Sequence, residues 1–280
     1  MSSENSTKMT VVFVHGLWLH GESWNKWIEF FRENSYNAVA ASWPGDSETT
    51  EATRKNAVAV AGYGVTEISD HLARQLKAFE KKPILIGHSF GGLMVQNLLG
   101  RNLAAAAIAI DPAPIKGVPE LPLSALKSSF TVLGNPFNFK RAVSLSEQQF
   151  HFGFTNAVSE QEAKELYATY AMPAPGRPLF QAATATFNPG SATKVDVANV
   201  ARGPLLLISG AEDNTVPPVL VRSTLKAYHT STAVTEFKEF AGRGHSLTID
   251  HGWQEIAEYC LAWLKTKQLW SGNGAYTQAV

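Results

Sequence analysis

A serine inside a glycine-rich hexapeptide is the residue best placed to do chemistry. Residues 87–92 read Gly-His-Ser-Phe-Gly-Gly and directly follow the apolar run 84–86, a pattern that predicts a strand, a sharp turn and a helix. A side chain on such a turn points away from the backbone, and flanking glycines let neighbouring chain pass close by. The helix beginning near Phe90 would direct free N–H groups and its positive dipole end at a developing oxyanion. We therefore expect Ser89 to be a nucleophile.

A serine hydroxyl is a weak nucleophile at neutral pH, so Ser89 needs a base, and the base needs an orienting acid. His245 is the favoured base because it lies in Gly-Arg-Gly-His-Ser (242–246), directly after the last expected strand. His88 is expected to pack beneath the turn, and His15 to brace the loop after the first strand by hydrogen bonding. Surface exposure is the default for the other five histidines, of which His151 is also a candidate for substrate contact: His20, His71, His151, His229 and His251.

The favoured acid is Asp213. It follows the strand expected at 205–209, so it belongs at the same edge of the sheet as the other candidates. Asp111, at the end of the preceding strand, and Glu212 are alternative acids. Each of the three carboxylates could instead cap backbone N–H groups at a strand end.

Acyl transfer also requires two N–H donors near the carbonyl oxygen that becomes negative. Phe90 can donate one. The other is expected from Leu17, because Gly16 before it permits close backbone approach. Trp18 then lines the mouth of the pocket or packs beneath the inserted segment.

Short apolar or β-branched runs alternate with helical patterns along much of the chain. This alternation predicts an α/β fold whose mostly parallel sheet is covered by helices on both sides. The six expected strands are 11–14, 37–41, 83–86, 105–110, 205–209 and 234–240. The helical patterns are centred on residues 24–31, 65–79, 90–99, 219–228 and 256–264.

The segment 113–200 breaks this alternation. It carries prolines and helical signals but no long strand, so we expect an inserted helical cap, with residues 1–112 and 201–280 forming the core domain. Ser159 and Glu162 predict a capping box at the start of a helix over 160–170. The many aromatic residues of this segment could roof an apolar pocket, and Phe154 is expected, with Trp18 and His151, to contact substrate.

Composition narrows the classes of function. With 24 basic and 24 acidic residues among 280, the chain has no net charge to attract nucleic acid or an anionic membrane. The single cysteine, Cys260, falls in an apolar helical pattern, and no histidine–cysteine spacing predicts a metal site. The polar leader 1–10 lacks the layout of a signal peptide, and no run is long enough to span a membrane, so a cytoplasmic location is expected. The tail 271–280 shows no clear helical pattern.

The order Ser89, Asp213, His245, with His15-Gly16 upstream, resembles the α/β-hydrolase family from residue 11 to about 265. The resemblance implies a nucleophile elbow at Ser89, an acid at Asp213, a general base at His245 and oxyanion donors at Leu17 and Phe90. It also implies a sheet trimmed to six parallel strands, in the order 37-11-83-105-205-234 by first residue. Serine at the elbow excludes the branches that use aspartate there.

The activity expected from this resemblance is hydrolysis of a medium-sized, largely apolar ester or lactone, with no cofactor or metal. One alternative is the cofactor-free haloperoxidase and perhydrolase branch, in which peroxide replaces water. An alternative of a different class is a ligand-binding receptor that keeps the fold. Both a monomer and a homodimer are compatible with the sequence.

Overall fold

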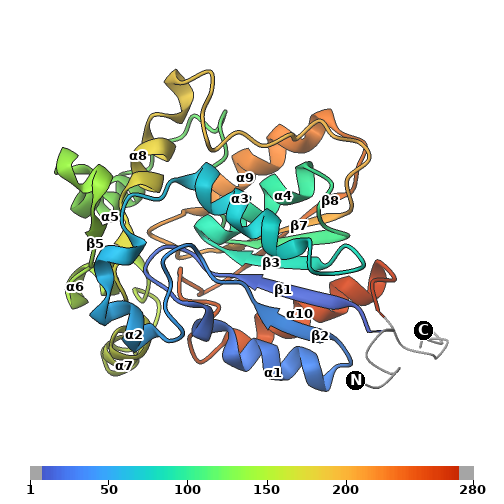
Figure 1. Cartoon of the computed structure of the whole chain (residues 1–280), viewed down its shortest axis with the longest axis horizontal. Coiled ribbons are helices and arrows are strands. Elements are labelled where there is room, and N and C mark those ends of the chain that lie inside the picture. The colour runs from blue at the N-terminus through green and yellow to red at the C-terminus, as the bar shows by residue number, and fades with distance from the viewer. Residues whose placement is uncertain (1–7, 271–280) are drawn as a thin grey trace.

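Six parallel strands form the central sheet of the computed structural model, which describes residues 8–270 (Figure 1). Their order is β2-β1-β3-β4-β7-β8, which confirms the order expected from the sequence. The strands are β1 (Thr10–Val14), β2 (Asn37–Ala40), β3 (Ile84–His88), β4 (Ala106–Ile110), β7 (Leu205–Gly210) and β8 (Thr235–Phe240). Their register places Gly87 beside Val14 and His88 beside Ile110. The loops after β1, β3 and β4 therefore all leave the sheet at the same end, where the strands have their carboxyl ends.

Alternate residues of the strands pack into two separate cores, one on each face of the sheet. Val12 and Val14 of β1 belong to the core beneath α3 (Val65–Leu76), α4 (Phe90–Gly100) and α9 (Pro218–Ala227). Val11 and Phe13 belong to the other core, beneath α1 (Asn25–Glu33) and α10 (Trp253–Thr266). Cys260 is fully buried in this second core, as expected of a small apolar side chain. Figure 1 shows the two layers of helices on opposite sides of the sheet.

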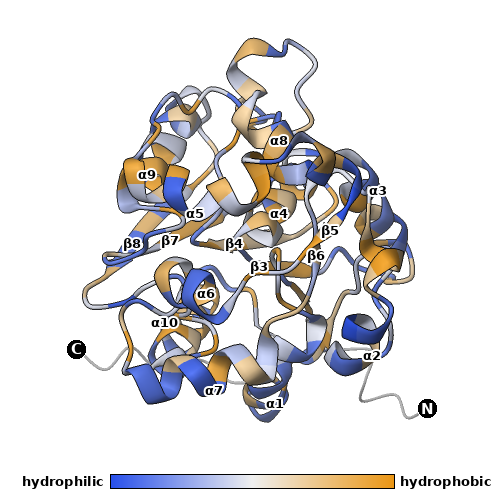
Figure 2. Cartoon of the chain, turned by 90° about the vertical axis from the view of Figure 1, so that its left-hand side faces the viewer, coloured by the Kyte–Doolittle hydropathy of each residue, from blue (hydrophilic) through white to orange (hydrophobic). Residues whose placement is uncertain are grey.

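The chain between β4 and β7 contains helices and only two very short strands, β5 (Ala142–Val143) and β6 (Ala174–Pro175). The helices are α5 (Leu123–Leu133), α6 (Glu147–Gly153), α7 (Glu160–Tyr170) and α8 (Arg177–Ala183). They gather beyond the carboxyl ends of the sheet strands, away from both termini (Figure 1). Figure 2 looks onto this end of the molecule, where α5 to α8 lie in front of the strand ends.

The remaining elements are short and lie in the connections. They are α2 (Thr50–Lys55) and the 3-10 helices Gly21–Trp24, Ala57–Val60, Pro136–Lys140, Ala185–Phe187 and Tyr228–Thr230. Within residues 8–270, no helix is long and apolar enough to cross a membrane. The expectations for the first seven residues of the leader and for the tail 271–280 lie outside the described part of the chain.

The structure corrects two local predictions. Helix α7 begins where the sequence predicted, and the Ser159 hydroxyl accepts a hydrogen bond from the Glu162 amide. The Glu162 carboxylate, however, accepts from the backbone and ring of His251 instead of closing a capping box. His20 was expected at the surface but is buried. Its ring nitrogens are satisfied there, since Nδ1 accepts from the Glu22 amide and Nε2 donates to the Ser47 carbonyl.

Candidate active site

Ser89 lies at the turn between β3 and α4, with φ 56° and ψ −122°. A positive φ is unusual for a residue with a side chain and costs of order 1–3 kcal/mol. The turn is fixed from both sides, because the Ser89 amide donates to the Ile110 carbonyl at 2.9 Å and its carbonyl accepts from the Leu93 and Ala113 amides. These hydrogen bonds hold the strained turn in place at the carboxyl end of β3.

Two glycines make room for this turn. A Cβ added to Gly16 would lie 2.6 Å from the Ser89 Cβ and 2.9 Å from the His88 carbonyl oxygen. A Cβ on Gly87 would lie 2.3 Å from the Gly91 carbonyl oxygen. The loop after β1 and the start of α4 therefore pack against the Ser89 turn more closely than any side chain would allow.

His245 and Asp213 form a buried hydrogen bond. The His245 Nδ1 and the Asp213 Oδ2 are 2.6 Å apart, and neither side chain is exposed. A carboxylate can only accept, so Nδ1 carries the proton and donates it. Among the described residues, the other ring nitrogen, Nε2, has no hydrogen-bond partner. The structure therefore shows no hydrogen bond between this nitrogen and the Ser89 hydroxyl, and Nε2 is the ring nitrogen available to take a proton.

The loop that carries Asp213 is held by its own amides and by the inserted segment. Asp213 Oδ1 accepts from the amides of Thr215 and Val216 at 2.7 and 2.8 Å. The Thr215 hydroxyl and the Asn214 side-chain amide donate to carbonyls at the end of α6. These contacts fix the direction of the Asp213 carboxylate, and with it the orientation of the His245 ring.

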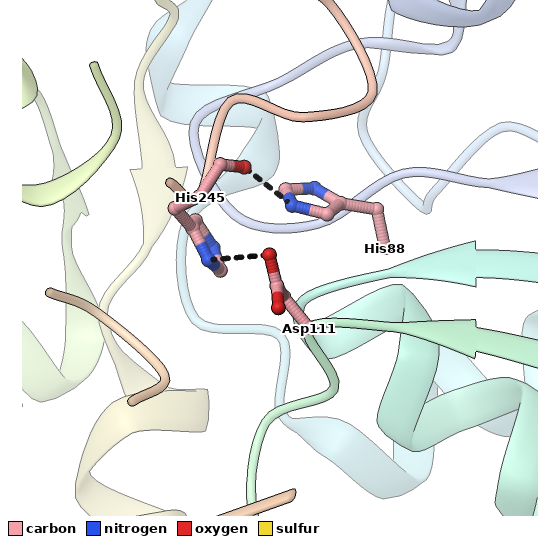
Figure 3. A group of neighbouring side chains, drawn as sticks. All are labelled: His88, Asp111 and His245. Atoms are coloured by element: carbon pink, nitrogen blue, oxygen red, sulfur yellow. Dashed lines mark hydrogen bonds and ion pairs between the residues drawn. The ribbon is translucent and has the colours of Figure 1, made fainter. Parts of the chain in front are cut away.

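His88 supports the same histidine from the backbone side (Figure 3). Its Nε2 donates to the His245 carbonyl at 2.9 Å, and the two ring centroids are 4.5 Å apart. Burial and the neighbouring His245 hold the pKa of His88 well below its ordinary value, which keeps its ring neutral. The sequence-based expectation that His88 packs beneath the turn is confirmed, and its partner is His245.

Asp111 directly follows β4 and lies close to both of these histidines (Figure 3). Its Oδ2 is 4.0 Å from the His245 Nδ1, and its Oδ1 accepts from the Gly210 amide at 2.7 Å. Burial and the nearby charge of Asp213 raise its pKa well above the ordinary value. One ligand atom each from His88, Asp111 and His245 falls within 4.8 Å of the others, a spacing that a metal ion could bridge. Two of the ring nitrogens, His88 Nε2 and His245 Nδ1, already take part in hydrogen bonds.

The loop after β1 is braced by His15, as the sequence predicted. Its Nδ1 donates to the Gly16 carbonyl at 2.9 Å, and its Nε2 donates to the Asp46 carboxylate at 3.0 Å. Both side chains of this pair are buried. The carbonyl and N–H of a trans peptide point in opposite directions, so the Leu17 amide points away from the His15 ring.

A largely apolar cavity of about 780 Å³, part of it open to solvent, begins at Ser89. Trp18, Ser89 and Phe90 line it, together with Thr215, Val216 and Leu220, which follow β7 or belong to α9. The remaining wall is mostly aliphatic and comes from the chain between β4 and α8: Ala113, Pro114, Glu120, Leu121, Pro122, Ala125, Leu126, Ser128, Ser129, Leu133, Leu179, Ala182 and Ala183.

This arrangement agrees with the match found by comparison with protein families. The model of the alpha/beta hydrolase family matches residues 11–259. The chain belongs to the alpha/beta hydrolase family. No curated protein sequence matches it.

Solved structures with the alpha/beta hydrolase fold resemble this chain over nearly its whole length. The monoacylglycerol lipase of Paleococcus ferrophilus is 22% identical, with a TM-score of 0.63 over 92% of this chain and 94% of the lipase. An extracellular alpha/beta-hydrolase from a Paenibacillus species is 20% identical, with a TM-score of 0.66 over 91% and 98%. The putative non-heme bromoperoxidase BpoC of Mycobacterium tuberculosis is 16% identical, with a TM-score of 0.63 over 92% and 92%. At these identities the likeness establishes the fold.

Of the three residues expected to contact substrate in this alpha/beta hydrolase, Trp18 lines the cavity and the other two do not. The ring of Phe154 is 1% exposed and lies edge-on to the His245 ring, with centroids 4.7 Å apart. The His151 ring contacts the hydroxyl of Thr155. Phe154 therefore packs against His245, and contact of either residue with substrate stays a prediction.

The aromatic residues of 113–200 do not form the roof that the sequence suggested. Four of them are exposed, namely Phe130, Phe137, Phe139 and Phe187, while Phe150 is buried. None of the aromatic residues of this segment lines the cavity at Ser89. Aliphatic side chains of α5, α8 and the loop before α5 supply its apolar wall instead.

Proposed function

We propose that this alpha/beta hydrolase is a serine hydrolase that cleaves a carboxylic ester or lactone through an acyl-enzyme on Ser89. The observation that carries this proposal is the buried 2.6 Å hydrogen bond between His245 and Asp213, which leaves the His245 Nε2 free. A histidine with one nitrogen fixed by a carboxylate and the other free is arranged to take a proton.

In the first half of the reaction, His245 Nε2 removes the Ser89 proton as the hydroxyl oxygen attacks the carbonyl carbon. Asp213 stabilises the resulting imidazolium and keeps its own charge. The tetrahedral intermediate collapses when His245 returns the proton to the leaving alcohol. In the second half, a water gives a proton to His245 and attacks the acyl-enzyme, and His245 returns that proton to the Ser89 oxygen as the acid is released.

The backbone amides of Leu17 and Phe90 are the proposed oxyanion donors. Phe90 opens α4, where the first amides have no carbonyl partner within the helix. The Leu17 amide points away from the His15 ring because that ring holds the preceding carbonyl. Losing one such donor typically costs about 2.7–4 kcal/mol of transition-state stabilisation.

The proposed substrate is of medium size and largely apolar, and segment 113–200 is proposed to act as its cap. The aliphatic wall of the cavity supports this choice, since α5 and α8 contribute much of it. Apolar surface in a ligand gains about 25 cal/mol for each Å² that it removes from water. A chain of several carbons is therefore favoured over acetate.

Steady-state hydrolysis of p-nitrophenyl esters of increasing acyl length, together with simple lactones, tests the proposal. We expect kcat/KM to rise from acetate to a medium chain, and to vanish in Ser89→Ala for every substrate. Hydrolysis by Ser89→Ala at the wild-type rate would overturn the mechanism. Adding peroxide and acetate to the same assay separates perhydrolysis, in which peroxide replaces water in the second half.

A further inference from the structure

Two buried carboxyl groups, those of Asp111 and Asp213, lie near the Nδ1 of His245, and this nitrogen can donate its proton to only one of them. The Asp213 Oδ2 is 2.6 Å from the His245 Nδ1, and the Asp111 Oδ2 is 4.0 Å from the same atom. Neither carboxyl group is exposed to solvent. The single Nδ1 proton is donated in a hydrogen bond to the nearer oxygen, that of Asp213, so Asp111 receives no hydrogen bond from the imidazole.

The donors around the two carboxyl groups are divided unequally. Asp213 has three, from the Thr215 and Val216 amides and from His245. Asp111 has one, the Gly210 amide at its Oδ1, and its buried Oδ2 has no donor among the described residues. A buried anionic oxygen without a donor beside a second carboxylate is costly.

A proton on the Asp111 Oδ2 removes that cost. The oxygen then becomes a donor, and the Asp213 carboxylate is the acceptor beside it, since the Oδ2 atoms of both residues lie within 4.0 Å of the same His245 Nδ1. Of the other titratable groups facing Asp111, Asp250 also disfavours a charge on it, while His88 stays neutral. Burial, Asp213 and Asp250 therefore all raise the pKa of Asp111.

We propose that Asp111 is a protonated positioning residue that donates a hydrogen bond to Asp213, and that it replaces Asp213 as the partner of His245 when Asp213 loses its charge. One proton is thus held between the two carboxyl groups, and one negative charge faces the imidazolium. The kinetic part of this proposal rests on the proposed function, whereas the protonation itself does not.

Infrared difference spectroscopy at neutral pH tests the protonation without any assay of activity. Ordinary carboxyl groups are ionised there, so the C=O stretch of a protonated side-chain carboxyl marks a group with a raised pKa. We expect such a band in the wild type, its loss in Asp111→Asn and its retention in the control Asp250→Asn. A band that survives in Asp111→Asn, or a wild-type spectrum without one, would overturn the proposal.

Kinetics of double variants test the second role. In Asp213→Asn, we expect residual activity that depends on Asp111, so that adding Asp111→Asn lowers it roughly tenfold further, a coupling typical of residues in one network. Equal activities of Asp213→Asn and the double variant would refute that role. With Asp213 intact, the side-chain amide of Asp111→Asn can still donate to Asp213. We therefore expect this variant to retain roughly tenfold more activity than Asp111→Ala. Should the wild type hydrolyse no ester, the proposed function fails while the infrared result still decides the protonation of Asp111.

Discussion

His88 Nε2 donates a 2.9 Å hydrogen bond to the backbone carbonyl of His245, so the residue before the candidate nucleophile holds the main chain of the candidate base. The turn after β3 and the loop after β8 are 157 positions apart in sequence. This bond joins them directly. Edge-on packing of Phe154 on the His245 ring completes the support.

The neutral ring of His88 predicts a stability that falls in acid. Its pKa is depressed in the folded protein, so its contribution is present above the unfolded value of about 6.5 and is lost as pH falls below it. The loss is up to about 1.4 kcal/mol per pH unit. In His88→Gln, whose amide can still donate to His245, we expect the free energy of unfolding to depend less steeply on pH between about 6.5 and 4.5.

Urea denaturation at several pH values measures this difference. His229→Gln is the matched control, because His229 is exposed and should leave the wild-type slope intact. If His88→Gln and the wild type lose stability in parallel on acidification, the neutral state of His88 is wrong.

The close packing of Gly16 predicts that a single methyl group there disturbs Ser89. In Gly16→Ala, the new Cβ would lie 2.6 Å from the Ser89 Cβ, so the turn or the loop after β1 must move. We expect a loss of about 1–3 kcal/mol in stability and of about 100-fold in kcat/KM, since a displacement of 1 Å can cost that much. In the control Gly21→Ala, the nearest atom would be the Ala40 Cβ at 3.4 Å, and esterase activity should persist. Full activity of Gly16→Ala would show that the two segments are not rigidly packed.

The buried hydrogen bond between His15 and Asp46 predicts that stability depends on the Asp46 carboxylate. A hydrogen bond to a charged group contributes about 1.5–3 kcal/mol, and the same carboxylate also accepts from the Trp43 amide, so Asp46→Asn should lower the free energy of unfolding by about that much. The exposed pair of Asp70 and Arg101 is the control, and Asp70→Asn should cost no more than about 1 kcal/mol. Equal effects of the two variants would mean that the buried hydrogen bond to Asp46 contributes no more than an exposed ion pair.

The aliphatic wall of the cavity predicts that acyl specificity can be changed from α5. Ala125 lines the cavity, so Ala125→Phe should reduce kcat/KM for medium-chain esters by about tenfold or more while acetate esters change little, because the phenyl ring occupies the space of the longer chain. The same substitution at Ala262, on the exposed face of α10, should leave the chain-length profile unaltered. A parallel fall for short and long esters in Ala125→Phe would place the acyl chain elsewhere.

The sequence predicted the sheet and the order of its strands because each strand is short, apolar and bounded by glycine or proline. It also predicted that Asp213 and His245 lie close together, because both follow strands of one parallel sheet. Contacts between separate loops could not be predicted from the sequence, because they depend on the three-dimensional arrangement of those loops. Asp111 was weighed as an alternative to Asp213, and only the fold shows both carboxyl groups behind one imidazole.

The inserted segment was the least predictable part. Helical periodicity indicates where α7 begins, but it does not indicate which neighbour covers each face. Phe154 and Phe130 are the same residue type, yet one is 1% and the other 70% exposed. Counting aromatic residues therefore did not identify the side chains of the apolar cavity wall, which are mostly aliphatic.

Intact-protein mass spectrometry after treatment with a fluorophosphonate tests the central claim most directly. The reagent phosphonylates an activated serine with loss of fluoride, so the account predicts one stoichiometric adduct on the wild type, none on Ser89→Ala and slow labelling of His245→Ala. An unlabelled wild type that is folded, or an adduct that persists in Ser89→Ala, would contradict the account.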